Sequence, residues 1–157
     1  MGSMLNLGAL EAVKNRAQFL KRLGVPPANA VYGEQVHGAK AACVEKMPPQ
    51  GFFPKTDALV TNKPGVFLFV LTADCFPIFL FDEKIPAVGI AHAGWRSIVR
   101  DLLPNTIQAL KKYYKTDPQK LKARIGPGIR KCHFEVKEDA LFHFKNYRYF
   151  ILRKKNK

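Results

Sequence analysis

The sequence predicts an α+β fold, a layered mixed α/β sandwich in a single domain. Three observations lead to this expectation. Short apolar runs are typical of buried strands, two segments have helical spacing of apolar residues, and 157 residues with 47% hydrophobic content suffice for one sizeable core. Neither an internal repeat nor a low-complexity linker divides the chain. We therefore expect strands and helices packed in layers around one core.

Two segments are predicted to be amphipathic helices. In residues 10–20, apolar side chains recur every three or four positions, and Gly24 is a typical C-terminal stop. In residues 103–114 the same spacing recurs, and Pro104 lies in the first turn, where a helix tolerates proline. Each helix is expected to bury its apolar face against the rest of the domain.

Three apolar runs are predicted to be buried strands. They are residues 66–71 (VFLFVL), 77–81 (PIFLF) and 87–91 (AVGIA), with the polar turn 82–84 between the second and the third. The first run leads into Cys75, and the third ends next to His92. Both side chains are therefore expected at strand ends, where a sheet holds them rigidly at one rim.

His37, Cys75 and His92 are candidate ligands of one metal ion. Two imidazoles and one thiolate suit Zn²⁺, and three protein ligands with an open fourth position are typical of a catalytic zinc. No two of the three have the close spacing of a zinc finger or an HExxH helix, so the fold must bring them together. Taken singly, each is more often an inert core residue, and only their combination favours the metal site.

The charge of the chain is strongly positive. Lys and Arg outnumber Asp and Glu by 26 to 12, a net charge of +14 that is partly concentrated in residues 111–137 and 148–157. Such a balance attracts phosphates and, without specificity, polyanions. Solvated helix faces and an exposed tail explain it equally well, and the sequence contains no module that reads nucleic acid. We therefore expect no specific nucleic-acid partner.

Composition also bears on compartment and boundaries. Three cysteines without a disulfide framework favour a reducing compartment, and neither a signal peptide nor a membrane span is visible. The expected location is the cytoplasm, with a monomer or a homodimer as the assembly. We divide the chain into an N-terminal remnant at 1–4, a core at 5–147 and a basic C-terminal end at 148–157.

Five short blocks give the chain a specific resemblance. They are QVHG at 35–38, TDALVTNKPG at 56–65, TADCFP at 72–77, HAGWR at 92–96 and IGPGIRKCHFEV at 125–136. In this order the blocks resemble the laccase-domain family, also called YfiH-like or multicopper polyphenol oxidase-like proteins. The match extends over about residues 5–136, and the resemblance implies the YfiH-like fold.

The resemblance also implies a metal and an activity. Family members bind Zn²⁺ through the residues that correspond to His37, Cys75 and His92. They are described as cleaving adenosine, inosine and methylthioadenosine with phosphate and as deaminating adenosine. Older descriptions assign Cu²⁺ and polyphenol oxidation, but four histidines are too few for a multicopper cluster in one chain. Cys132 and His133 are adjacent, so on a strand they would point to opposite faces and not share an ion.

Further site residues are expected around this centre. Arg96 is the first choice for binding phosphate, because a guanidinium grips oxyanions bidentately, although a surface salt bridge explains this residue equally well. Asp74 is expected to act as general acid or base, or to orient a ligand, unless it only caps a turn. Gln35, the backbone amide of Gly126 and, on resemblance alone, Glu135 are expected to line the substrate pocket.

The sequence also departs from the family pattern. The strands and the HxGD segment that normally precede the first helix are missing, Ser97 stands where glycine is common, and the chain stops where family members continue. The expectation is thus a family member shortened at both ends. Three competing functions stay open: a metal-binding protein without turnover, a cysteine hydrolase or amidase in which His92 activates Cys75, and a copper-dependent polyphenol oxidase.

Overall fold

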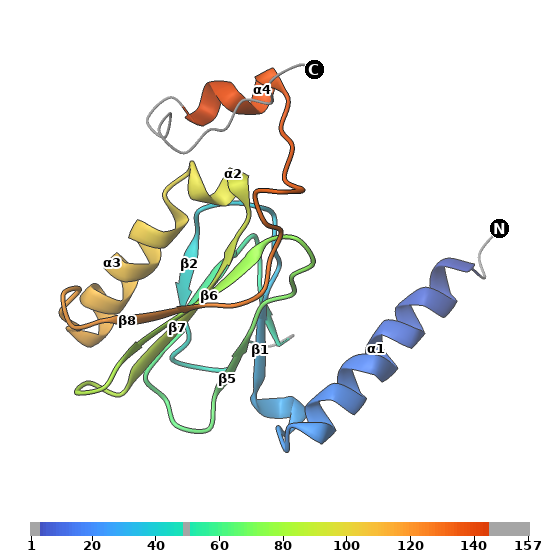
Figure 1. The fold of residues 1–157 in the computed structure, drawn as a ribbon. Coiled ribbons are helices and arrows are strands. Elements are labelled where there is room, and N and C mark those ends of the chain that lie inside the picture. Colours follow the sequence, from blue (N-terminus) through green and yellow to red (C-terminus); the bar gives the residue numbers. More distant parts are fainter. Residues whose placement is uncertain (1–3, 49–50, 145–157) are drawn as a thin grey trace.

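The computed structural model describes residues 4–48 and 51–144 (Figure 1). The basic end at 148–157 and residues 1–3 lie outside this part of the chain. The elements follow in this order: α1 (Met4–Arg22), a 3₁₀ turn (Pro27–Asn29), β1 (Ala30–Gly33), β2 (Ala41–Cys43), β3 (Phe52–Phe53), β4 (Ala58–Thr61), β5 (Phe67–Phe69), β6 (Phe76–Asp82), β7 (Ala87–Ala93), α2 (Trp95–Ile98), α3 (Leu102–Tyr114), β8 (Lys122–Ile125) and α4 (Glu138–Leu141).

The strands form two sheets. The larger sheet has the order β2-β4-β7-β6-β8, with β2 and β4 parallel and the other neighbours antiparallel. The smaller sheet has the order β3-β1-β5, and both of its pairings are parallel. This is the layered mixed α/β arrangement that the sequence predicts.

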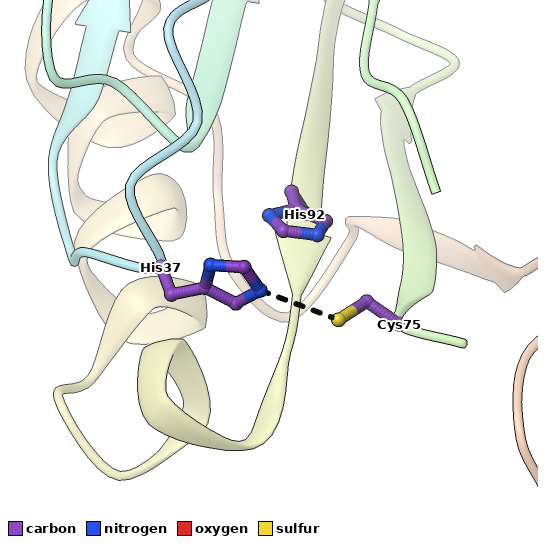
Figure 2. Close-up of side chains that lie close together, drawn as sticks. All are labelled: His37, Cys75 and His92. Atoms are coloured by element: carbon purple, nitrogen blue, oxygen red, sulfur yellow. Dashed lines mark hydrogen bonds between the residues drawn. The ribbon is translucent and has the colours of Figure 1, made fainter. Parts of the chain in front are cut away.

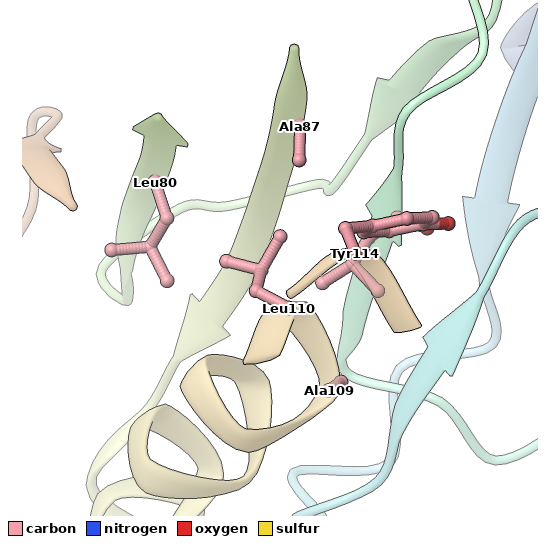
Figure 3. Close-up of a cluster of buried hydrophobic side chains, with 6 residues drawn as sticks. Leu80, Ala87, Ala109, Leu110 and Tyr114 are labelled. Atoms are coloured by element: carbon pink, nitrogen blue, oxygen red, sulfur yellow. The ribbon is translucent and has the colours of Figure 1, made fainter. Parts of the chain in front are cut away.

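Helix α3 covers one face of the larger sheet. Its wholly buried Leu110 packs among Val60, Leu80 and Ala87, and Tyr114 closes the cluster (Figure 3). The predicted proline in the first turn of this helix is confirmed, because Pro104 is the third residue of α3. Removal of a buried leucine side chain costs about 2–5 kcal/mol, so this layer is a main source of stability.

The smaller sheet packs against the opposite face of the larger one. Val31 of β1 and Leu68 of β5 meet Leu59 of β4 and Ile90 of β7 in a second core cluster. Because β7 contributes to the cores on both of its faces, it is buried from Ala87 to Ala93 except at Val88. This rigid central strand carries His92.

Two predicted elements differ in extent from the structure. The run 66–71 forms only the three-residue strand β5, and Leu71 is 60% exposed, because β5 pairs with β1 alone and lies at a sheet edge. Cys75 therefore directly precedes β6 and does not end β5. In α1, Leu20 is buried but Val13 is 62% exposed, so the expected burial of the apolar face is wrong over residues 11–19.

The C-terminal end of α1 is the part of the helix that packs against the rest of the protein. This end joins the body through Leu20, which packs with Val25 and Ala30, and Phe19 and Arg16 contact the rings of Phe69 and Tyr32. The N-terminal part of the helix extends away from the sheets (Figure 1). The predicted stop is confirmed, since α1 ends at Arg22 and Gly24 adopts a left-handed conformation with φ +66°. Among the described residues, no helix combines the length and apolar character that crossing a bilayer requires.

Candidate metal centre

Three segments that are distant in the sequence bring His37, Cys75 and His92 together (Figure 2). Their candidate ligand atoms all lie within 4.8 Å of one another. The Sγ atom of Cys75 is 3.8 Å from Nε2 of His37, and the centroids of the two imidazole rings are 4.8 Å apart. The predicted grouping of these three residues at one rim is thus present in the fold.

Strand pairing explains how two of the three meet. Strands β6 and β7 are antiparallel, and Phe76 and Pro77 lie opposite Ala93 and His92. The residue before β6, Cys75, is consequently next to the C-terminal end of β7. A hairpin of two well-packed strands therefore fixes the thiol relative to the imidazole of His92.

Gly94 leaves the space in which the three side chains converge. A Cβ atom at this position would lie 2.7 Å from Cδ2 of His37 and 2.9 Å from Sγ of Cys75. Both distances are shorter than real Cβ contacts, so any larger residue would push at least one candidate ligand away. The glycine of HAGWR is therefore required by close approach and not by its own backbone conformation, which is extended.

A buried carboxylate shapes the loop that carries His37. Asp57 is wholly buried and accepts hydrogen bonds from the backbone N–H groups of Val36, His37 and Gly38, at 3.1, 2.9 and 2.8 Å. His37 itself has φ +55°, a left-handed conformation that is uncommon for a residue other than glycine. The three hydrogen bonds offset the cost of this conformation and aim the imidazole at Cys75.

The same carboxylate contacts the other histidine. Nδ1 of His92 lies 3.0 Å from Oδ1 of Asp57, and the backbone N–H of His92 donates to the carbonyl oxygen of Asp57 at 2.8 Å. With Nδ1–H as donor, Nε2 keeps its lone pair for an ion. Sequence reasoning missed Asp57, although it lies in the block at 56–65, immediately before β4.

The environment of Cys75 disfavours a free thiolate. Burial raises the pKa of the Cys75 thiol, and the negative charges of Asp74 and Asp57 raise it further. A bound cation would reverse this balance, because metal coordination deprotonates a thiol. The surroundings thus favour a neutral thiol without metal and a thiolate ligand with it.

The residues present fit a single metal ion. Two imidazoles, one thiol and a carboxylate behind one imidazole are donors typical of zinc centres. Tetrahedral zinc places such ligand atoms roughly 3.3–3.6 Å apart. The 3.8 Å between Sγ of Cys75 and Nε2 of His37 is close to this range, and the three ligand atoms, which all lie within 4.8 Å of one another, would draw together around an ion. The exposed pair Cys132 and His133 lies outside this group. The expectation that the two point to opposite faces of a strand is wrong, because they lie in a turn and Nδ1 of His133 is 3.0 Å from the sulfur of Cys132.

The predicted arginine and aspartate are both exposed residues that neighbour candidate ligands or their strands in the sequence. Arg96 stacks its guanidinium on the ring of Trp95, 4.2 Å from the centroid, and is exposed. Asp74 is also exposed, and its backbone carbonyl accepts from the N–H of Ile129 at 2.8 Å. The roles of both in binding and proton transfer stay predictions.

The remaining predicted pocket residues have contacts that limit what they offer a substrate. The side-chain amide of Gln35 both donates to and accepts from the backbone of Leu71, at 2.7 Å each. The N–H of Gly126 donates to the carbonyl of Pro77, and a Cβ there would lie 2.6 Å from that proline ring. Gln35 and Gly126 thus hold the chain in place, and their contacts with substrate stay predictions.

Two further charged residues are Glu135, which the sequence predicted for the pocket, and Arg100, which contacts the loop of His37. Glu135 is exposed, in the loop after β8, and its role in the pocket stays a prediction. Arg100, which sequence reasoning did not single out, donates from Nη1 to the carbonyl oxygen of His37 at 3.1 Å. Its only signal in the sequence is a second arginine one helical turn after Arg96. The structure therefore places two cationic groups on the segment after β7.

The fold and the site define a mixed α/β protein with a candidate His₂Cys metal centre at the rim of its larger sheet. The chain belongs to the family described as multi-copper polyphenol oxidoreductase laccase, whose sequence profile matches residues 8–156. The resemblance inferred from the five blocks is thereby confirmed.

Relatives whose names state an activity are similar in sequence to most of this chain. A purine nucleoside phosphorylase of Streptomyces coelicolor is 39% identical over 132 residues, which are 84% of this chain and 53% of that protein. Adenosine deaminase RL5, from an unknown prokaryotic organism, is 29% identical over 144 residues, 87% of this chain and 55% of its own length. The chain thus spans about half the length of these relatives.

Solved structures show the same fold. The crystal structure of Bacillus licheniformis YfiH, a hypothetical protein, matches with a TM-score of 0.78 and 26% identity. The match covers 85% of this chain and 53% of that one. The predicted YfiH-like fold is therefore confirmed.

Proposed function

We propose that this chain carries a zinc centre at His37, Cys75 and His92 and cleaves purine nucleosides with phosphate. The observation that carries the proposal is the convergence of these three side chains around Gly94, backed by one buried carboxylate. The names of the relatives support a purine nucleoside and phosphate as substrates. Adenosine, inosine and methylthioadenosine are the proposed nucleosides.

The residues around the centre have distinct tasks in this proposal. When bound, zinc supplies a Lewis acid that polarises a ligand oxygen. The guanidinium groups of Arg96 and Arg100 provide donors for an oxyanion, because a planar guanidinium pairs with phosphate bidentately. Asp74, exposed beside Cys75, exchanges a proton with the purine base as it leaves. The net charge of +14 raises the concentration of phosphate near the protein.

Adenosine deamination is the second candidate. It is favoured by the relative named adenosine deaminase and by the open fourth position that three protein ligands leave for water. The two reactions differ in their co-substrate, since phosphorolysis consumes phosphate and deamination consumes water and releases ammonia.

A cysteine hydrolase and a multicopper oxidase have less support. A cysteine hydrolase needs an activated thiolate, whereas burial and two carboxylates raise the pKa of Cys75. A multicopper oxidase needs several metal centres, whereas the described residues provide one group of three ligands. A metal-binding protein without turnover is distinguished from the enzyme by experiment.

Metal content and product analysis test the proposal together. The purified chain should contain about one zinc per molecule, and His37→Ala should lose it, while the matched variant His133→Ala should keep it, because His133 lies outside the group. Inosine with phosphate should yield hypoxanthine and ribose 1-phosphate. Arg96→Ala should raise the phosphate concentration needed by about tenfold without loss of zinc, since one charge-assisted contact is worth about 1.4 kcal/mol or more.

Each result has a contrary outcome. A metal-free wild type, or full zinc retention in His37→Ala, would remove the site assignment. Ammonia release from adenosine without phosphate dependence would select the deaminase. Fully zinc-loaded protein that yields no product from any of these nucleosides would select the metal-binding protein without turnover.

A further inference from the structure

We infer that Asp57 is a positioning residue that couples the two histidine ligands, so that one carboxylate sets the conformation of His37 and the ring tautomer of His92. This inference rests on the proposed metal centre. Asp57 is not one of the three candidate ligands. Its carboxylate is not accessible to solvent, because the residue is wholly buried.

The four hydrogen bonds are divided evenly between the carboxylate oxygens. Oδ2 accepts from the N–H groups of Val36 and Gly38, and Oδ1 accepts from the N–H of His37 and from Nδ1 of His92. An ionised carboxylate has about four acceptor positions, so Asp57 is fully used. Oδ1 is shared by both histidines, which makes the position of one dependent on the other.

Strand pairing prevents the carboxylate from following a displaced loop. Asp57 lies immediately before β4, and its backbone carbonyl accepts from the N–H of His92, which extends the antiparallel pairing of β4 with β7 by one residue. The carboxylate is consequently anchored to the strand that carries His92. The loop at 36–38 is held to that strand through the Asp57 side chain.

This arrangement prepares the site before an ion arrives. The carboxylate stabilises both the left-handed backbone of His37 and the Nδ1–H tautomer of His92. Without it, zinc binding would have to order the loop and select the tautomer at the expense of affinity. Loss of a carboxylate behind a histidine ligand typically weakens metal binding by about 10–100-fold, and here two ligands depend on it.

The test is Asp57→Asn in the full chain, with zinc affinity measured by competition against a chromophoric chelator. An asparagine keeps one acceptor oxygen but turns an NH₂ group towards N–H donors, so either the loop or His92 loses its partner. We expect zinc affinity to fall by about 100-fold. In the cobalt(II)-substituted protein, the sulfur-to-metal absorption bands of the variant should shift or weaken.

Thr56→Val is the matched control. Thr56 is also wholly buried and adjacent in sequence, but its hydroxyl donates to the carbonyl of Pro54 and does not contact a ligand. This variant should lose stability and keep the zinc affinity and cobalt spectrum of the wild type. Unchanged zinc affinity in Asp57→Asn, or an equal loss in Thr56→Val, would overturn the inference.

A measurement on the wild type covers the case in which Asp57→Asn does not fold. Long-range ¹H–¹⁵N spectra of the metal-free protein should show His92 as the Nδ1–H tautomer, and a His92 with its proton on Nε2 would contradict the inference. This readout needs neither zinc nor turnover. A wild type that binds no zinc but shows this tautomer would therefore reject the proposed function and not the hydrogen-bonded arrangement.

Discussion

The rim that carries His92 and the surroundings of α1 are built in opposite ways. At the rim, Asp57 and His92 are buried and bonded to each other, and Gly94 lies in contact with two candidate ligands. Along α1, residues 11–19 are exposed, and the helix borders an apolar groove of about 660 Å³ that Phe69 and Phe79 also line. The difference indicates that the fold tolerates amino-acid substitutions in the exposed part of α1 better than at the rim.

Packing explains the contrast. The rim lies at the end of β7, which is covered by α3 on one face and by the smaller sheet on the other. Among the described residues, helix α1 contacts the body near its C-terminal end. Leu20 is buried, the ring of Phe19 has its centroid 6.4 Å from that of Phe69, and the guanidinium of Arg16 lies 4.7 Å from the centroid of the Tyr32 ring. Substitutions at the rim should therefore affect both stability and the site, whereas those at residues 11–15 of α1 should affect neither strongly.

The largest expected effect is at Gly94. In Gly94→Ala the new methyl group would overlap His37 and Cys75, so zinc should be lost from the purified protein or bound at least about 100-fold more weakly. The matched variant is Gly24→Ala, where nothing lies within 4 Å but φ is +66°. Gly24→Ala should cost about 1–2 kcal/mol of stability and leave the metal in place. Elemental analysis and thermal unfolding distinguish the two, and an intact zinc site in Gly94→Ala would contradict the packing argument.

The next effect concerns the core. Leu110→Ala should lower the free energy of unfolding by about 2–5 kcal/mol, because it leaves a cavity between α3 and the larger sheet. Val13→Ala, in the exposed part of α1, should change it by less than about 0.5 kcal/mol. Urea titrations of both variants measure the difference. A large loss of stability in Val13→Ala would show that α1 is covered in solution.

The smallest effect is a pH dependence in the core. Burial, with the Cys43 thiol 2.9 Å from its hydroxyl, raises the pKa of Tyr114 above its ordinary value. The folded protein thus keeps the Tyr114 proton where the unfolded chain releases it, so the stability that Tyr114 contributes should be constant below about pH 10 and fall as the pH rises above it. In Tyr114→Phe this part of the decline should disappear. Denaturant unfolding between pH 8 and pH 11 checks it, and identical pH slopes in both proteins would contradict the assignment.

The sequence predicted the parts of the fold that depend on local patterns. The hydrophobic runs around Cys75 and His92 identified β6 and β7, and the spacing in residues 103–114 identified α3 with its early proline. The sequence also singled out His37, Cys75 and His92, because each lies in a distinctive block and their donor types suit one ion; the structure brings them together, and their role as metal ligands stays a prediction. Residue type and local spacing carry this information.

The parts that it missed depend on contacts between distant segments. Nothing near Asp57 in the sequence shows that its carboxylate will receive three N–H groups from residues about 20 positions earlier. The apolar spacing of α1 predicted a helix but not what covers it, and the exposed Val13 shows that periodicity alone does not place a helix on a core. Similarly, the run 66–71 did not reveal that β5 lies at an edge.

The β6–β7 pairing has a consequence for the order in which the centre assembles. Cys75 and His92 belong to one hairpin, whose contacts are local in sequence and form early, because little chain entropy is lost in closing a short loop. We expect His37 to reach them only after the more distant segments around β1 and β4 have docked, because its loop is bonded to Asp57. In the proposed metal centre, we therefore expect a nascent or partly unfolded chain to offer two ligands, which would hold an ion weakly, and the third to complete the set at the end. Retention of metal would in this way report that folding is finished.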